Sequence, residues 1–176
     1  MGKLAKNCLS EQRFWEIINA SNGEAEGLKE QLRKLSYEEF FGYKYWWDYF
    51  HSTSYKQDLW AAAYAAMGGC SDDGFDYFRY WLVSRGKAIF FAAFENVDSI
   101  NDELLKTDYP EKEDFAYEFF NVFEDMFNKE FDSVEAEFDF EDVHKFPELN
   151  FEWSEDDTES IKKICPKIFD QWWDNP

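Results

Sequence analysis

The turn at 68–73 holds the residues whose types and spacing best suit chemistry. Cys70 stands directly before a helix predicted to begin at Ser71, and unpaired amides at a helix N-terminus favour an ionised thiol. The pattern therefore predicts a lowered pKa for Cys70. A cysteine nucleophile also needs a base, and the only histidines, His51 and His144, stand far from it in sequence. The alternative is that Cys70 is a small buried residue and the polar residues after it only cap a helix.

A second set combines carboxylates with arginines around the same helix: Asp72, Asp73, Arg79 and Arg85. Arg79 follows Asp72 by about two helical turns, so the two share a face. An arginine held by a carboxylate can bind a phosphate or carboxylate through two parallel hydrogen bonds. The alternative is a structural network that joins helix ends.

A third set is acidic and lies in the second half of the chain. Carboxylates alternate with aromatic residues there, which is the composition expected of a surface that captures a basic partner. The residues predicted to bind that partner are Glu135, Glu137, Phe138, Asp139, Phe140, Glu141 and Asp142, the two phenylalanines serving as anchors if they are exposed. A dedicated metal site is not expected, because the segment lacks the spacing and glycine of a calcium-binding loop.

The net charge of −20 falls almost entirely on this half. Residues 1–94 contain twelve acidic and eleven basic side chains, whereas residues 95–176 contain twenty-six acidic and seven basic ones. This asymmetry predicts a near-neutral scaffold joined to a segment that presents a negative field. Such a field repels phosphates and anionic lipids, so neither nucleic acid nor a membrane surface is expected as a partner.

Composition limits the class of protein. A chain of 176 residues is large enough for one domain that buries about 70% of its unfolded surface, so no disulfide or metal is needed. Phe, Tyr and Trp make up 22% of the residues and supply the core. Three widely spaced cysteines without a CxxC pair, a polar N-terminus and no long apolar run predict a cytoplasmic protein.

Helical periodicity dominates the pattern and predicts the elements that position these residues. We expect a mainly α fold: a compact, aromatic-rich multi-helix domain over 1–176, with an irregular acidic segment and at most one short strand or hairpin, near Phe138 and Phe140. It divides into a near-neutral scaffold at 10–94, an acidic variable segment at 95–153 and a C-terminal helix at 154–173. The expected helices begin at Ser10, near Leu28, at Ser36, near Tyr55, at Ser71, at Lys87, at Pro110 and at Ser154, and Pro166 interrupts the last one.

The central part of the chain resembles a known family. The motifs are DLWAAAY at 58–64, GGCSDDGF at 68–75, YFR at 77–79 and SRG at 84–86. Together they resemble the signature of a bacterial domain of unknown function (number 4240). The similarity extends over about 10–94 and 151–169, and 95–150 departs from it most. The resemblance implies a mainly helical, bacterial, cytoplasmic protein and brings no established activity.

The leading functional hypothesis is a non-enzymatic acidic binding protein, in its most specific form an immunity-type inhibitor that neutralises a basic bacterial toxin. One alternative is an enzyme or small-ligand protein that uses Cys70, Asp72 and Arg79. Another is a DNA-mimic inhibitor of a nucleic-acid-binding protein. No cofactor is expected, and the oligomeric state and the role of the C-terminal Trp172 and Trp173 stay open.

Overall fold

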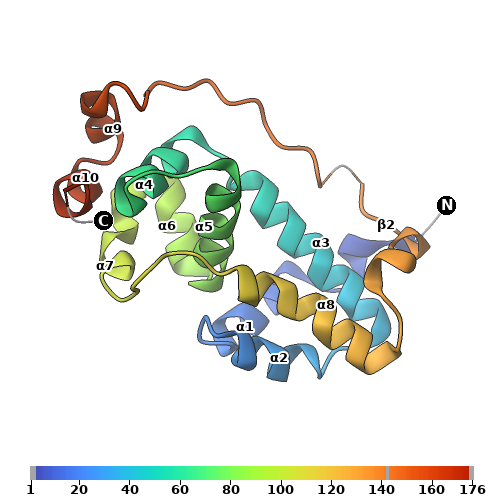
Figure 1. The fold of residues 1–176 in the computed structure, drawn as a ribbon. Coiled ribbons are helices and arrows are strands. Elements are labelled where there is room, and N and C mark those ends of the chain that lie inside the picture. Colours follow the sequence, from blue (N-terminus) through green and yellow to red (C-terminus); the bar gives the residue numbers. More distant parts are fainter. Residues whose placement is uncertain (1–2, 142, 175–176) are drawn as a thin grey trace.

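The computed structural model describes residues 3–141 and 143–174, and this part of the chain is mainly α-helical, as predicted (Figure 1). Its α-helices are α1 (Glu11–Ala20), α2 (Ala25–Leu32), α3 (Tyr37–Thr53), α4 (Gln57–Met67), α5 (Asp72–Ser84), α6 (Lys87–Glu95), α7 (Asn101–Leu104), α8 (Glu113–Phe127), α9 (Thr158–Ile164) and α10 (Pro166–Trp172). Among the described residues, no helix is both long enough and apolar enough to cross a membrane.

Local signals account for most helix ends in the first half. The Ser36 hydroxyl accepts a hydrogen bond from the Glu39 amide, and the Glu39 side chain accepts one from the Ser36 amide, so the predicted capping box begins α3. Gly68 ends α4 in the left-handed conformation, which a glycine adopts without strain. Ser71 caps α5 through the Gly74 amide, at 3.2 Å. These confirmed ends fix the 68–73 turn between α4 and α5.

The core is a continuous set of aromatic contacts centred on α3. Phe50 of α3 lies with its ring centroid 5.5 Å from that of Phe14 in α1 and 5.4 Å from that of Phe90 in α6. Phe40 lies 5.4 Å from Phe123 of α8, measured in the same way. Aromatic side chains bury large areas, so a few of them join four helices into one core.

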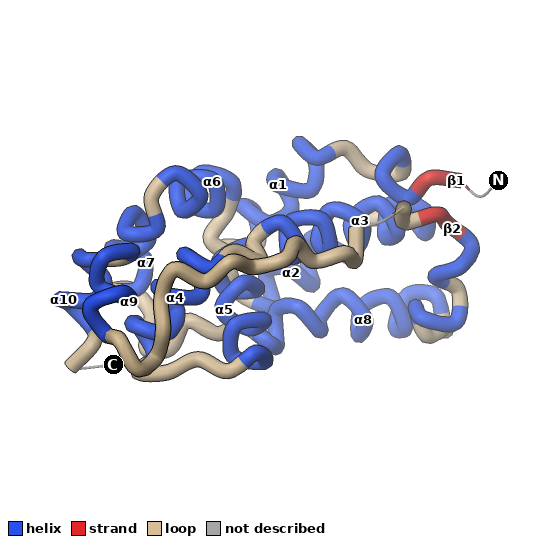
Figure 2. The backbone as a smooth tube through the Cα atoms, turned by 90° about the horizontal axis from the view of Figure 1, so that it is seen from above, coloured by secondary structure: helices blue, strands red, loops and turns tan. Residues whose placement is uncertain are grey.

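The predicted short strand is present, but it does not form a hairpin. β2 (Phe138–Asp139) pairs in parallel with β1 (Lys3–Leu4), so the acidic segment is joined to the N-terminal end of the chain. Figure 2 shows the two strands side by side at one end of the molecule, with α9 and α10 at the other. A parallel pair has distant partners, which a local pattern does not reveal.

Residues 143–157, here called the strap, contain no helix and cross the molecule from β2 to α9 (Figure 1). Trp153 fixes the strap to α4 by donating its indole N–H to the Gln57 carbonyl at 2.8 Å. The Glu152 amide donates to the Gln57 side chain at 3.3 Å. The strap therefore joins the two ends of the molecule along one surface.

Two predicted helix boundaries and one predicted buried residue are wrong. The long acidic helix begins at Glu113 rather than at Pro110, since the Lys112 amide donates to the Tyr77 carbonyl of α5 instead. The helical period places Met126 on the buried face of this helix, together with Phe115, Phe119, Val122 and Phe123, but Met126 is exposed. The last helix begins at Thr158 rather than Ser154, because residues 154–157 form a turn closed by the Ser154 amide and the Ser160 hydroxyl. Pro166 does interrupt it, as the first residue of α10.

The acidic segment contains the predicted long helix as well as irregular structure. Between 95 and 153 the chain forms α7 and the fifteen-residue α8. Residues 105–112 and most residues after α8 are irregular. The charged half of the sequence therefore supplies one core helix as well as the strap.

Candidate functional site

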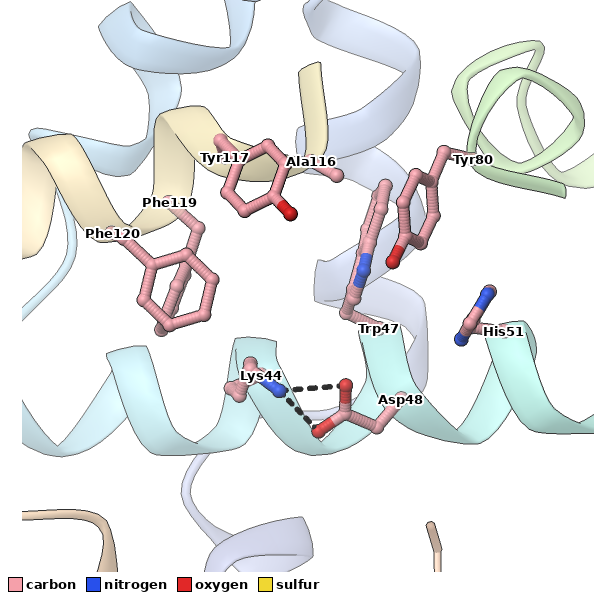
Figure 3. Close-up of a pocket in the computed structure, with 9 residues that line it drawn as sticks. All are labelled: Lys44, Trp47, Asp48, His51, Tyr80, Ala116, Tyr117, Phe119 and Phe120. Atoms are coloured by element: carbon pink, nitrogen blue, oxygen red, sulfur yellow. Dashed lines mark hydrogen bonds and ion pairs between the residues drawn. The ribbon is translucent and has the colours of Figure 1, made fainter. Parts of the chain in front are cut away.

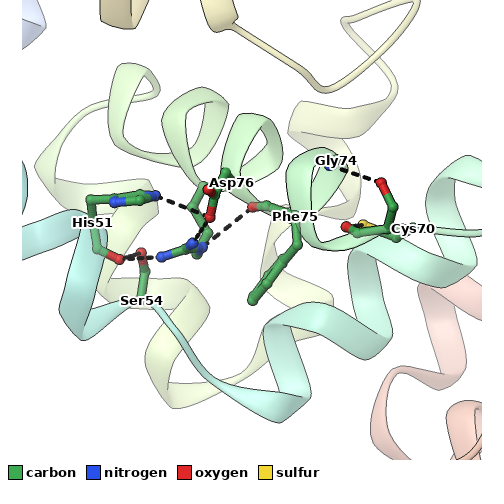
Figure 4. Close-up of polar contacts among 8 residues, drawn as sticks. His51, Ser54, Cys70, Gly74, Phe75 and Asp76 are labelled. Atoms are coloured by element: carbon green, nitrogen blue, oxygen red, sulfur yellow. Dashed lines mark hydrogen bonds and ion pairs between the residues drawn. The ribbon is translucent and has the colours of Figure 1, made fainter. Parts of the chain in front are cut away.

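Arg79 lies fully buried, and each of its three nitrogens has a partner inside the protein. Its guanidinium donates to the His51 carbonyl at 2.6 Å, to the Phe75 carbonyl at 3.3 Å and to the Asp76 carboxylate (Figure 4). The predicted pairing with Asp72 is therefore wrong, because Asp76, one turn before Arg79, takes that place. The arrangement joins the end of α3 to α5, as in the structural alternative, and leaves no donor exposed to a substrate.

His51 extends this network. Its Nε2 lies 3.6 Å from the Asp76 carboxylate, and its ring lies 4.7 Å from the Tyr80 ring, between centroids. Burial lowers the pKa of His51, and Arg79 lowers it further, although Asp76 opposes both effects. Burial alone would raise the pKa of Asp76, but its contacts with His51 and Arg79 outweigh burial and hold that pKa below its ordinary value.

Cys70 does not have the lowered pKa that the turn predicted. Burial raises the pKa of the thiol to about 12, and the nearby Glu111 carboxylate adds to the effect. The helix N-terminus does not compensate, because the Ser71 hydroxyl already caps it. The thiol donates to the Ser71 carbonyl at 3.6 Å. A protonated thiol is a poor nucleophile.

The remaining predicted residues of this set are dispersed. Arg85 donates to the Gly23 carbonyl at 3.1 Å, and burial lowers its pKa. Asp73 is exposed in the first turn of α5. Only Cys70 and Asp72 come together, at the edge of a cavity.

That cavity, here called the strap cavity, has a volume of about 360 Å³. It is lined by Trp60, Cys70, Asp72, Phe151, Trp153, Ser154 and Glu155. Phe151, which is 51% exposed, stands nearly edge-on to two indoles, with its ring centroid 5.6 Å from Trp60 at 64° and 5.6 Å from Trp153 at 80°. Two carboxylates and three aromatic rings thus meet around one open space, and no Lys or Arg is among the lining residues.

Hydrogen bonds hold two walls of the strap cavity in place. The Trp60 indole donates to the Cys70 carbonyl at 3.1 Å and its ring stacks on Phe75 at 4.7 Å. The Glu155 carboxylate accepts from the Tyr64 hydroxyl at 3.2 Å. The two indoles, Trp60 and Trp153, are therefore held in place by hydrogen bonds within the chain.

The described part of the predicted partner-binding segment, 135–141, lies at the β2 end of the molecule, at the opposite end from α9 (Figure 1). The prediction treats Phe138 and Phe140 as anchors only if they are exposed, and neither is. Phe138 stacks on Phe41 with ring centroids 4.0 Å apart, and Phe140 is buried. Asp139 is exposed, and Asp142 lies outside the described residues.

Two carboxylates of this segment have partners within the chain. Glu137 accepts from the Tyr37 hydroxyl at 3.0 Å, and Glu141 pairs with Lys6 at 2.8 Å. Glu135 is half-buried. The segment therefore presents charge but no exposed aromatic anchor.

A second cavity, here called the interhelical cavity, lies between α3, α5 and α8 and has a volume of about 240 Å³ (Figure 3). Sequence reasoning did not find it. From α3 it takes Lys44, Trp47, Asp48 and His51, whose spacing places them on one helical face. The other lining residues are Tyr80, Ala116, Tyr117, Phe119 and Phe120. The sequence signal that could have indicated this cavity is the presence of three ionisable residues, Lys44, Asp48 and His51, on a face of α3 that also carries aromatic residues.

Among the described residues, no group of three or more His, Cys, Asp or Glu side chains is placed to hold a metal ion. Both cavities are lined by aromatic rings and polar side chains.

Comparison with known proteins gives one match. A family model described as "Protein of unknown function (DUF4240)" matches residues 9–129, and no curated protein or solved structure matches the chain. The match confirms the resemblance seen in the sequence over the signature at 58–86. It differs from the expected range in two ways, because it continues past 94 to include α8 and it does not include 151–169. Fifteen acidic and four basic residues follow Lys129, so a large part of the negative charge lies outside the matched region.

Proposed function

The chain belongs to the DUF4240 family, whose function is unknown, and we propose from its own geometry that it is a non-enzymatic binding protein that captures a basic protein. The observation that carries the proposal is the strap cavity. It brings aromatic rings and the Asp72 and Glu155 carboxylates together without a basic residue in its lining. A cavity of this composition favours the cationic head of a lysine or arginine from a partner.

Ring orientation supports a cationic occupant. A cation is attracted to the face of an aromatic ring within about 6 Å of its centroid, most strongly for tryptophan. Trp60 uses one ring face against Phe75, and the rings of Phe151 and Trp153 meet nearly at right angles. Rings so inclined surround a space from several sides, and the carboxylates add direct charge attraction.

The charge around the cavity supports a protein partner. Exposed carboxylates continue along the strap and into the turn before α9, at Glu148, Glu152, Glu155, Asp156 and Asp157. A field of one sign raises the rate of encounter with an oppositely charged protein, and an anchor in a pocket slows dissociation. The anchoring surface proposed is thus the strap cavity, and 135–142 adds charge at the far end.

The most specific form of the proposal is an immunity-type inhibitor that neutralises a basic bacterial toxin. A toxin that binds phosphate presents lysines and arginines, which the strap cavity and its field suit. The Cys70 pKa of about 12 does not favour the enzyme alternative. A DNA mimic shares the acidic surface, but its binding would not depend on an aromatic cavity.

The test compares two exposed phenylalanines of the strap. Phe151 lines the cavity and is 51% exposed, whereas Phe146 does not line it and is 48% exposed. The wild-type protein, Phe151→Ala and Phe146→Ala are used as baits in native cells, and a captured protein is purified and titrated from about 10 mM to about 150 mM salt.

The proposal expects a captured protein that is basic, that binds more weakly as salt rises, and that is lost with Phe151→Ala but kept with Phe146→Ala. Co-expression should also relieve any toxicity of that protein. A captured protein that binds independently of salt, or equally well to both variants, would overturn the proposal.

A further inference from the structure

The interhelical cavity has a composition that capture of a basic protein does not require, and we propose that it is a second binding site, for a small neutral planar nitrogen heterocycle of the nucleobase class. Figure 3 shows an open space bounded by Phe119 and Phe120 on one side, by Tyr80 and His51 on the other, and by the paired Lys44 and Asp48 along α3. The site is independent of the strap cavity, with which it shares no lining residue.

The charged pair in its wall is the first line of evidence. The Lys44 ammonium lies 2.7 and 2.6 Å from the two oxygens of Asp48, and the side chains are only 15% and 12% exposed. Many other pairs of the molecule, such as Arg13–Glu16, lie on the surface, and the Arg79–Asp76 pair has its carboxylate 42% exposed. Taking two charges out of water costs free energy that the pair rarely recovers, and apolar residues of similar size often stabilise a fold as well or better. A half-enclosed pair beside an open space is therefore better explained by recognition than by stability.

The aromatic walls are the second line. Trp47 and Phe119 are buried, and the exposed Tyr117 forms the rim. Flat rings that surround a space favour a flat occupant, since stacking on aromatic side chains contributes about 1–3 kcal/mol per nucleic-acid base and tolerates any base. A cavity of about 150 Å³ already holds benzene, so the 240 Å³ here suits a molecule of one or two rings.

The polar end selects the chemistry of the occupant. Lys44 offers donors and Asp48 offers acceptors side by side, which matches an edge that carries both an acceptor and a donor, as nucleobases do. The ammonium and the carboxylate already balance each other, so a neutral ligand leaves that balance intact. An anion would meet the overall charge of −20, and a cation would compete with Lys44 for Asp48.

The test uses adenine, cytosine and nicotinamide as probes, with the indole N–H signal of Trp47 in NMR as the readout. Cyclohexanecarboxamide, which has an amide but no planar ring, and benzoate, which is planar but anionic, serve as negative probes. At about 10 mM, a concentration that detects weak millimolar binding, the planar neutral probes should shift the Trp47 signal and the negative probes should not.

A matched pair of exposed tyrosines makes the test specific. Tyr117 is 51% exposed at the rim of this cavity, and Tyr109 is 53% exposed elsewhere. Tyr117→Ala should weaken binding of the planar probes about tenfold, and Tyr109→Ala should leave it unchanged. Because both positions are exposed, both variants should keep the wild-type melting temperature, which is measured alongside.

Three results would overturn the proposal: no shift of the Trp47 signal with any planar probe, equal shifts with cyclohexanecarboxamide, or equal affinities of the two tyrosine variants. A fourth result concerns the double variant Lys44→Met/Asp48→Leu, which keeps side chains of similar volume but removes the ammonium donors and the carboxylate acceptors. If it binds the planar probes as tightly as the wild type, the polar edge has no part in recognition and the proposed ligand class is wrong.

Discussion

The two cavities both place carboxylates beside aromatic rings, but only one of them balances the charge. In the interhelical cavity Asp48 is held by Lys44, and both are nearly enclosed. In the strap cavity Asp72 and Glu155 are exposed, and no basic side chain joins them in the lining. The first arrangement is complete without an ionic ligand, whereas the second leaves negative charge available. We infer that balance of charge, rather than its amount, separates a small-molecule site from a protein-docking site in this fold.

The cavities also differ in the parts of the chain that supply their lining residues. Every lining residue of the interhelical cavity belongs to the region matched by the family model, while four of the seven residues around the strap cavity lie beyond it. The matched region thus contains one complete cavity. The strap completes the other by packing against α4 and the start of α5.

The reactivity of Cys70 offers the largest expected effect. If the strap cavity docks a side chain rather than catalysing a reaction, its only thiol should be inert. With a pKa of about 12, Cys70 in a Cys8→Ser/Cys165→Ser variant should react with iodoacetamide at neutral pH roughly a thousandfold more slowly than glutathione, since only the thiolate attacks. The rate is measured by mass spectrometry. A rate equal to that of glutathione would restore the enzyme alternative.

The Lys44–Asp48 pair gives the next largest effect. Lys44→Met leaves the Asp48 carboxylate 12% exposed without its cation, which should cost about 3 kcal/mol of unfolding free energy. The double variant Lys44→Met/Asp48→Leu should recover most of that loss, because no charge is left unpaired. Urea denaturation measures both.

Asp72→Asn is the matched change in the strap cavity. It removes an exposed carboxylate that the cavity does not pair, so its effect on the free energy of unfolding should stay within about 0.5 kcal/mol. If Asp72→Asn destabilised the protein as much as Lys44→Met, the difference between balanced and unbalanced cavities would disappear.

Sequence reasoning recovered what local chemistry decides. The capping box at Ser36, the terminal glycine at position 68 and the break at Pro166 depend on neighbours a few residues away, and all three are confirmed. The helix-start pattern at 154–157 gave a wrong boundary because a contact several residues further along the chain intervenes. Serine followed by three acids suits a helix start, but in this chain those residues form a turn that Ser160 closes.

The sites were harder to predict because they depend on distant contacts. Arg79 has carboxylates before it at several helical spacings, and only the packing of α3 against α5 selects Asp76. The alternation at Phe138 and Phe140 predicted a strand but not that the fold would cover both rings. Lys44, Asp48 and His51 stand on one face of α3, yet that face looks solvent-exposed until α8 is known to cover it.

A smaller effect should be seen in the binding of a cationic probe, which we expect at the strap cavity. The Nα-acetyl methylamide of lysine represents a partner's side chain, and the corresponding norleucine compound is its uncharged control. The lysine probe should shift the indole N–H signals of Trp60 and Trp153, and Phe151→Ala should weaken its binding by up to about tenfold. Phe146→Ala should leave it unchanged. Equal binding of the norleucine compound would mean that the cavity takes any aliphatic chain, and the charge argument would fail.

The smallest effect distinguishes the cavities by pH, because only the interhelical cavity has a histidine among its lining residues. Burial holds the pKa of His51 in the folded protein below its ordinary value of 6.5. At pH values between the lowered pKa and 6.5, the unfolded chain therefore binds more protons than the folded one. Stability from this group is therefore complete above 6.5 and is lost as the pH falls through that value toward the lowered one. Asp76, whose pKa is also lowered, affects stability only below its ordinary pKa of 3.8 and does not contribute in this pH range.

Between about pH 7.5 and about pH 5.5, the wild-type urea midpoint should fall more than that of His51→Gln. His144→Gln removes the other imidazole, which is 53% exposed and lies 3.7 Å from the Asp48 carboxylate, so this variant measures the contribution of that contact separately. If His51→Gln kept the full wild-type decline, the buried imidazole would not be the group that couples this cavity to pH.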